Sequence, residues 1–253
     1  MARVLAMTEE ADRGMGLKSV LPGIIVASAL STIFQSSVNG QSSTEPQAEP
    51  EADFHVQLPS NLRVLAFTGW VQGAGYPFRQ WYSAAGLGYQ FKPILREHLE
   101  NIDPDKEQYL VVAGGYEFLR TVQSGKLTYE DRMGIEVIPG FRPLSRLLVR
   151  DRNRVEFRII NGAYSTRYRN QLSIETDILA HGFRFTPYAS AEAFYDAPKQ
   201  SWNQELYTAG VQWPHKRLMM LDTYYQRGNC PICKPAHWNV AGATLNFYFR
   251  NAR

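Results

Sequence analysis

Charged side chains alternate with apolar ones along two neighbouring segments of this chain. From 150 to 158 every second residue is Arg or Glu, and in 163–178 one parity carries Arg167, Arg169 and Glu175. A β-strand turns alternate side chains to opposite faces, so each segment has a charged face and an apolar face. Guanidinium and carboxylate groups either pair with one another or bind a small charged solute. The charged face is therefore a candidate ion-pair network or a candidate selectivity zone.

The ion-pair interpretation predicts a narrow barrel lumen filled by side chains of both signs, because charges confined in a small interior need partners. The alternative interpretation is a selectivity zone for a small solute. Under the first interpretation, neutralising Glu156 or Glu175 destabilises the barrel more than it alters permeation. The predicted members of this lumen charge network are Glu130, Arg132, Glu136, Arg150, Arg152, Arg154, Glu156, Arg158, Arg167, Arg169, Glu175, Glu192 and Asp222.

The two cysteines, Cys230 and Cys233, are separated by two residues. A redox role for such a pair requires the first Cys at a helix N-terminus, but this segment lies between predicted strands. His237 would add a third metal ligand, yet no second Cys/His pair completes a metal site. In an oxidising compartment we expect a disulfide that stiffens a loop, with a metal site and a redox pair as the alternatives.

An enzymatic barrel would place a histidine with an aspartate or a serine near its outer rim, where a substrate arrives. Of the five histidines we expect only His237 on that side, and we expect Asp196 and Ser201 on the same rim. Nothing in the sequence fixes the geometry of these three groups. The sequence therefore predicts no catalytic, cofactor-binding or metal-binding residue.

Two-residue periodicity extends over most of the chain after residue 61. It predicts an all-β fold in which about ten strands form an antiparallel meander. The predicted strands span 61–72, 79–92, 107–121, 128–138, 147–160, 163–178, 187–195, 204–213, 217–226 and 238–249.

Alternation alone also fits a soluble β-barrel or sandwich with its apolar face turned inward. Three observations favour instead a transmembrane barrel with charge inside and lipid outside. Aromatic residues gather near the strand ends of the apolar face, as membrane girdles require. Charges on the other face alternate in sign between neighbouring segments, and the chain closes on an aromatic strand, LNFYF (245–249).

Composition excludes two other classes. The formal net charge of the 253 residues is +3, and Lys and Arg are not gathered into one block, so no nucleic-acid surface is indicated. No run of about 20 apolar residues follows the N-terminal region, which argues against a helical membrane bundle.

The sequence of the N-terminal region is typical of a targeting segment. Lys18 precedes an apolar stretch, and Val38 and Gly40 suit the −3 and −1 positions of a cleavage site, so residues 1–40 are predicted to be a signal peptide. Met15 is an alternative start, because the acidic residues before it are unusual ahead of a signal core. Residues 41–60, rich in Gln, Ser, Glu and Pro, are predicted to be a disordered leader, and 61–250 the barrel.

Several short motifs resemble one protein family. They are RNRVEFR (152–158), RYRNQL (167–172), SAEAFYD (190–196), the Trp202-Asn203 pair and LNFYF (245–249). In their order and spacing they resemble the DUF2490 family of bacterial outer-membrane-type barrels, over about residues 61–250. The resemblance implies a barrel in the outer membrane and supplies no catalytic residue, because the family has no assigned function.

We therefore expect a monomeric barrel in a bacterial outer membrane, in contact with the lipid bilayer and with no cofactor or nucleic acid. The expected function is that of a non-enzymatic envelope protein with a narrow, charge-paired lumen. A narrow pore for small solutes is the alternative, and an outer-membrane enzyme or a soluble periplasmic barrel is a more distant one.

Overall fold

The structure is a computed structural model that describes residues 44–59, 61–74, 77–91, 106, 109–144, 146–180, 182–215 and 218–250. The predicted signal peptide, residues 1–40, lies outside these ranges. The elements are β1 (Thr44–Gln57), β2 (Leu62–Gly73), β3 (Phe78–Phe91), β4 (Leu110–Gln123), β5 (Lys126–Leu144), β6 (Leu147–Ile160), β7 (Ala163–Thr176), β8 (Ile178–Ala180), β9 (Phe183–Asp196), the 3-10 turn η3 (Ala197–Lys199), β10 (Ser201–His215), β11 (Met219–Asn229) and β12 (His237–Arg250).

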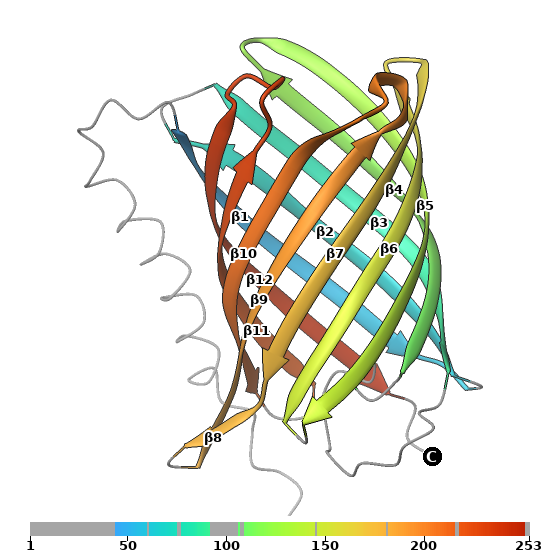
Figure 1. The fold of residues 1–253 in the computed structure, drawn as a ribbon, viewed down its shortest axis with the longest axis vertical. Helices are drawn as coiled ribbons and strands as arrows, with labels where there is room; N and C mark the ends of the chain where they lie inside the picture. Colours follow the sequence, from blue (N-terminus) through green and yellow to red (C-terminus); the bar gives the residue numbers. More distant parts are fainter. Residues whose placement is uncertain are drawn as a thin grey trace, which may run out of the picture. The chain divides into compact units, whose positions relative to one another are not determined.

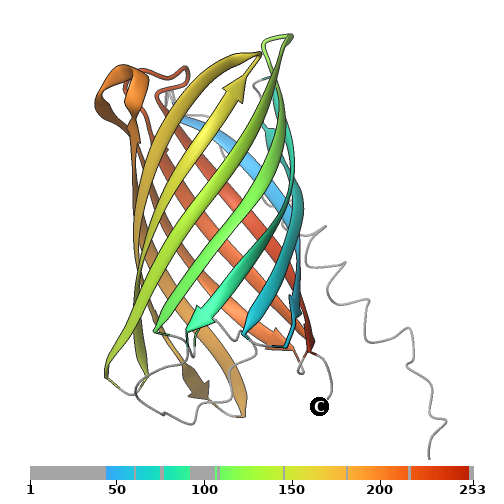
Figure 2. The same ribbon diagram turned by 90° about the vertical axis from the view of Figure 1, so that its right-hand side faces the viewer.

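Eleven of these strands close into one barrel, and β8 pairs only with the start of β9 at one end. The strands run obliquely around the barrel in both ribbon views (Figures 1 and 2). All ten strands predicted from the alternation are present as an antiparallel series, so the all-β meander is confirmed. None of the described residues forms a helix long and apolar enough to cross a membrane.

The eleventh strand is β1, which lies between β2 and β12. It pairs with β2 antiparallel and with β12 parallel, in a register from Thr44 opposite His237 to Gln57 opposite Arg250. A meander with an odd number of strands has its first and last strands pointing in the same direction, so the pair that closes the ring must be parallel.

The prediction of a disordered leader at 41–60 is therefore wrong for most of that segment. The segment also has a two-residue alternation that its composition alone does not reveal. Glu49, Glu51 and Asp53 share one parity, and Ala52 and Phe54 share the other. The carboxylates of this strand face the lumen, where tyrosine and threonine hydroxyls bind them. Pairing on both edges satisfies the backbone of a segment whose composition alone favours disorder.

Two upper hairpins are closed by turns that need left-handed backbone conformations. Ser124 and Gly125 have φ of 50° and 78°, and Asn161 and Gly162 have φ of 49° and 85°. Two successive positive φ angles are typical of two-residue turns whose twist matches that of the flanking strands, and Asn-Gly is a preferred pair there. These turns lie at the upper end of the barrel in Figure 1.

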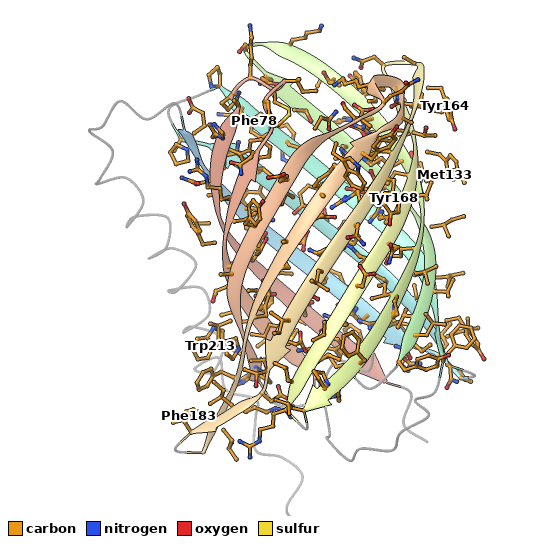
Figure 3. All side chains as sticks on the ribbon, in the orientation of Figure 1. Phe78, Met133, Tyr164, Tyr168, Phe183 and Trp213 are labelled. Carbon is orange, nitrogen blue, oxygen red and sulfur yellow. A yellow bond between two sulfur atoms is a disulfide. The ribbon has the colours of Figure 1, made fainter. Side chains whose placement is uncertain are left out.

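The two faces of the barrel wall are distributed as a membrane barrel requires, with apolar side chains outside. Leu87, Met133 and Ile135 are 57%, 64% and 57% exposed, whereas Glu156 is 0% exposed. Figure 3 shows Met133 and Phe183 projecting away from the barrel. A soluble barrel would instead turn its apolar face inward.

Exposed aromatic residues gather near both ends of the strands. Trp70, Trp81 and Trp202 are about half exposed near the upper end, and Phe91 and Trp213 near the lower end. Aromatic belts at two levels are typical of proteins that meet two membrane–water interfaces.

A polar cluster interrupts the apolar outer face near the middle of β6 and β7. Asn170 donates to Asp151 over 2.6 Å, Asn153 donates to Asp151 over 3.1 Å, and the Tyr168 hydroxyl donates to Asn153. Because these groups satisfy one another, the cost of placing them on an apolar surface is reduced.

Candidate functional site

The centre of the lumen is a buried carboxylate, Glu156 on β6, held by three arginines. Its oxygens lie 3.1 Å from Arg154, 2.6 Å from Arg167 and 2.9 Å from Arg169. The antiparallel register of β6 and β7 places Arg167 directly opposite Glu156 and Arg169 opposite Arg154. Strand pairing alone therefore brings the four groups together.

The ladder of ion pairs extends from this centre along the wall. Above Glu156, Glu130 accepts from Arg132 and Arg158 at 2.5 Å each. On the β9 side, Glu192 lies 2.8 Å from Arg152 and 2.7 Å from Arg169.

Glu117 on β4 also belongs to this ladder, although the predicted network omitted it. Its oxygens lie 3.4 Å from Arg132 and 3.2 Å from Arg154. The alternation around 117 did place this carboxylate opposite an apolar face, so the signal was present. One carboxylate on a strand otherwise lined by apolar and small residues gave no indication of a charged neighbour.

At the lower end the ladder finishes at Glu175, in contact with a residue from outside the strands. Lys106 lies 2.8 Å from Glu175, and Arg150 lies 3.6 Å from it. Lys106 also donates to Gln212 over 2.6 Å, and Arg142 donates to the backbone oxygen of Lys106 over 2.9 Å. The lysine is 5% exposed, so the connection between β3 and β4 contributes a buried cation to the lumen.

Two stacked aromatic rings and a guanidinium group form a layer at the lower end of the lumen. The His55 and Tyr248 rings stack with centroids 4.5 Å apart, and Arg63 contacts both of them. All three side chains are buried. Together with Lys106 and Glu175 they form a group of buried polar side chains at the base of the lumen.

The opposite wall, formed by β1 and β11, carries carboxylates bound by hydroxyl groups instead of arginines. The Tyr82 hydroxyl lies 2.9 Å from Glu49 and 2.7 Å from Glu51, and the Tyr224 hydroxyl lies 2.8 Å from Glu49. Within the described part of the chain, no Lys or Arg lies at ion-pair distance from Glu49, Glu51 or Asp222. The lumen therefore has a wall of paired arginines and glutamates on one side and, among the described residues, a wall of carboxylates without arginine partners on the other.

Eleven of the thirteen predicted members of the lumen charge network form ion pairs in the structure, and two do not form one among the described residues. Asp222 lies on the opposite wall, where it accepts from Gln212 over 3.5 Å and forms no ion pair among the described residues. Glu136 faces the lumen beside Arg154 but also forms no ion pair there. Alternation gives the face of a residue but not its distance from a partner, whether that partner lies across the lumen, as for Asp222, or on the neighbouring strand, as for Glu136.

Two adjoining cavities lie between the two walls of the lumen. The upper one has a volume of about 660 Å³ and the lower one about 280 Å³. Both are bordered by Glu51, Asp53 and Arg154. The lower cavity is bordered by Gly86, Gly88 and Gly115, where the wall has no side chains to fill the space.

The predicted disulfide between Cys230 and Cys233 is present in the loop joining β11 to β12. The backbone oxygen of Lys234 in this loop accepts from the Gln123 side chain over 2.6 Å. Cys233, Lys234 and Pro235 border the upper cavity, so the loop covers part of the upper mouth.

The structure brings together two of the three candidate catalytic residues, because Ser201 lies opposite Asp196 where β9 and β10 pair, but it does not bring His237 to them. His237 contacts the Asn229 side chain over 3.0 Å, whereas Asp196 pairs with Lys199 over 3.3 Å on another part of the rim. β9 and β12 are separated in the barrel by β10 and β11. Among the described residues no group of three His, Cys, Asp or Glu side chains has a metal-binding arrangement.

Comparison with known proteins bears on family and fold. LpxR from Salmonella typhimurium is a structural neighbour with 8% sequence identity and a TM-score of 0.44, over 74% of this chain and 83% of that one. No curated protein matches the chain. The family model described as a protein of unknown function, DUF2490, matches residues 101–230, which is more than half of the sequence. The chain belongs to the DUF2490 family.

Proposed function

We propose that this protein is a non-enzymatic barrel of the bacterial outer membrane, whose lumen is closed by paired charges. It is monomeric in this proposal, and lipid is its principal neighbour. The observation that carries the proposal is the complete pairing of the arginine wall. Arg132, Arg150, Arg152, Arg154, Arg158, Arg167 and Arg169 each lie within 4.0 Å of a glutamate.

A lumen of this kind has a mechanical role. Each guanidinium joins a carboxylate on the same or another strand, so the pairs link β4 through β9 from inside. Removing water from such groups is costly, and the cost is offset only when each charge is paired with good geometry. The network therefore stiffens the barrel while it occupies the space that a wide channel would need.

The membrane setting is supported by the outer face. Its exposed Leu, Ile, Val and Met side chains lie between two levels of aromatic residues, which matches the apolar band and girdles of outer-membrane barrels. Fractionation of bacteria that express the full chain tests this assignment. Recovery in the outer membrane, with heat-modifiable migration on gels, is expected, and recovery as a soluble periplasmic protein contradicts it.

A narrow pore is the second candidate, because the two adjoining cavities give the lumen some free volume. Planar-bilayer recording of the refolded protein separates the two functions. A closed structural barrel gives no steady conductance above that of the protein-free bilayer. Regular unitary steps in wild-type protein would establish the pore instead.

A further inference from the structure

The upper cavity has a lining that the proposed structural role does not require. Six amide side chains border its volume of about 660 Å³, and they come from strands all around the barrel. They are Gln47, Gln80, Gln123, Gln171, Gln204 and Gln226.

Some of these amides retain hydrogen-bonding capacity. Gln80 donates to Thr121 over 2.8 Å and Gln226 donates to Thr208 over 3.0 Å, which leaves their carbonyl oxygens as acceptors. For Gln47 and Gln204 the structure gives no side-chain hydrogen bond within the ranges it describes. An amide offers both donors and acceptors, so the lining complements neutral groups that also do both.

Aromatic surfaces border the same space. Trp238 lines the cavity and packs against Gly228, where any side chain would collide with the indole ring. Phe78 and Phe194 also line the cavity, and the guanidinium of Arg169 lies over the Phe194 ring at 4.6 Å. Flat apolar faces beside convergent polar groups are the usual composition of a small-molecule site, and the volume lies within the range of about 300–1,000 Å³.

The fixed charges around this cavity do not favour a simple anion. Arg152, Arg167 and Arg169 are held by Glu156 and Glu192, so none offers an uncompensated positive charge. Glu49 and Glu51 on the facing wall already accept from tyrosine hydroxyls, which is the type of bond that a ligand hydroxyl would also make. The lining as a whole is suited to hydroxyl groups that both donate and accept.

We propose that the upper lumen cavity binds a neutral, hydroxyl-rich small molecule of the size of a mono- or disaccharide. The glutamine amides and the Glu49–Glu51 carboxylates hydrogen-bond its hydroxyls, and Trp238 offers a flat surface to its C–H face. This inference goes beyond the structural role, because a barrel whose lumen serves only to stiffen the barrel itself needs no such compartment.

The test is isothermal titration of the full chain, refolded in an alkylamine-oxide detergent that has no sugar headgroup. The probes are glucose, maltose and sucrose, with spermidine and citrate as a cation and an anion. The proposal expects saturable binding of at least one saccharide. It expects the double variant Gln47→Ala, Gln204→Ala to weaken that binding roughly tenfold, the effect of losing about two neutral hydrogen bonds.

Gln72→Ala is the matched control, because Gln72 lies on the neighbouring strand β2, faces outward and does not line the cavity. It should leave affinity unchanged. The side chains of Gln47 and Gln204 form no hydrogen bond within the described ranges, so their loss should leave heat-modifiability at the wild-type value, which separates a binding defect from misfolding. Spermidine or citrate binding without saccharide binding overturns the proposal, as does no binding at all or equal binding in the double variant. None of these outcomes affects the conductance test of the structural role.

Discussion

Glu156 has no exposed surface and lies within 3.1 Å of three guanidinium groups. A buried carboxylate of this kind depends on its guanidinium partners to offset its loss of hydration, and the buried guanidinium groups depend on the carboxylate in the same way. Removing Glu156 should lower the free energy of unfolding by more than its ion pairs contribute on balance, because the arginines remain buried without a counter-charge.

Replacing Glu156 with Gln should therefore lower the free energy of unfolding by about 3 kcal/mol or more. The measurement is urea unfolding of the refolded protein in detergent micelles, with the temperature of heat modification as a second readout. Glu205→Gln is the control, since Glu205 is exposed on the outer face and, within the described part of the chain, its only side-chain hydrogen bond is the one that Tyr207 donates over 2.9 Å. Equal stability of wild type and Glu156→Gln would contradict a structural role for the network.

Residue types on one strand predicted most of this network, since Arg and Glu of one parity must share a face. They did not predict Lys106, which lies in the connection between β3 and β4 and pairs with Glu175 on β7, a strand far from it in the sequence. Nor did they place Asp222 on the wall opposite the arginines, because sequence spacing contains no measure of distance across a closed ring.

At the scale of elements, β1 is the least expected feature. It completes the ring by a parallel pair with β12, and its outward-facing Ala48 lies opposite Ala241. The composition that suggested disorder, including Pro46 and Pro50, is compatible with a strand that receives partners on both edges.

A cysteine pair tests this closing seam. With Cys230 and Cys233 replaced by Ser, the double variant Ala48→Cys, Ala241→Cys should form a crosslink under mild oxidation, because paired residues bring their Cβ atoms within reach of a disulfide. Ala48→Cys with Thr223→Cys is the control, since Thr223 lies one strand further away, opposite Ala243. Equal crosslinking of both pairs, or of neither, would indicate that β1 does not occupy this register. The readout is migration on a non-reducing gel.

The short β8–β9 hairpin continues the wall below the barrel and depends on Asp177. This carboxylate accepts from Thr186 over 2.6 Å and pairs with Arg184 over 2.9 Å. Burial raises the pKa of Asp177, but the Thr186 hydrogen bond and the Arg184 charge outweigh burial, so the pKa lies below its ordinary value. A carboxylate with a lowered pKa stabilises the folded state above its unfolded pKa, and that contribution disappears as pH falls through the folded value.

Asp177→Asn should accordingly be less stable than wild type at pH 7, and the difference should shrink as the pH is lowered below the ordinary range for aspartate. Denaturant unfolding of both proteins between pH 7 and pH 3 measures the difference. Asp196→Asn offers a comparison at the opposite rim, where the partner Lys199 is 55% exposed and the expected effect is small. A difference that grew at low pH would have the wrong sign for this carboxylate.

At the scale of the whole molecule, the barrel is inside out relative to a soluble one. Charges line its interior, and its exposed apolar side chains form a band that lipid would cover in the proposed membrane setting. The cost of a charge on this band should therefore depend on its height.

Two lysine substitutions on β5 test that dependence. Ile135 is at the midpoint of the strand and 57% exposed, whereas Leu127 is 42% exposed beside the upper turn. In lipid vesicles Ile135→Lys should cost about 2–4 kcal/mol of folding free energy and Leu127→Lys about 0–1 kcal/mol. Equal costs at both positions would argue against a bilayer centred on the barrel.

The sequence by itself determined the periodicity, and with it the strand class, the charged and apolar faces, and the closeness of the two cysteines in one loop. These are local properties, because the two-residue repeat of a strand is set by the backbone of each segment alone. The tertiary structure decided the parallel closure through β1, the polarity across the lumen and the amide-lined upper cavity. Those features depend on which residues face one another across a closed ring, and that is set by strand number, register and curvature, not by spacing along the chain.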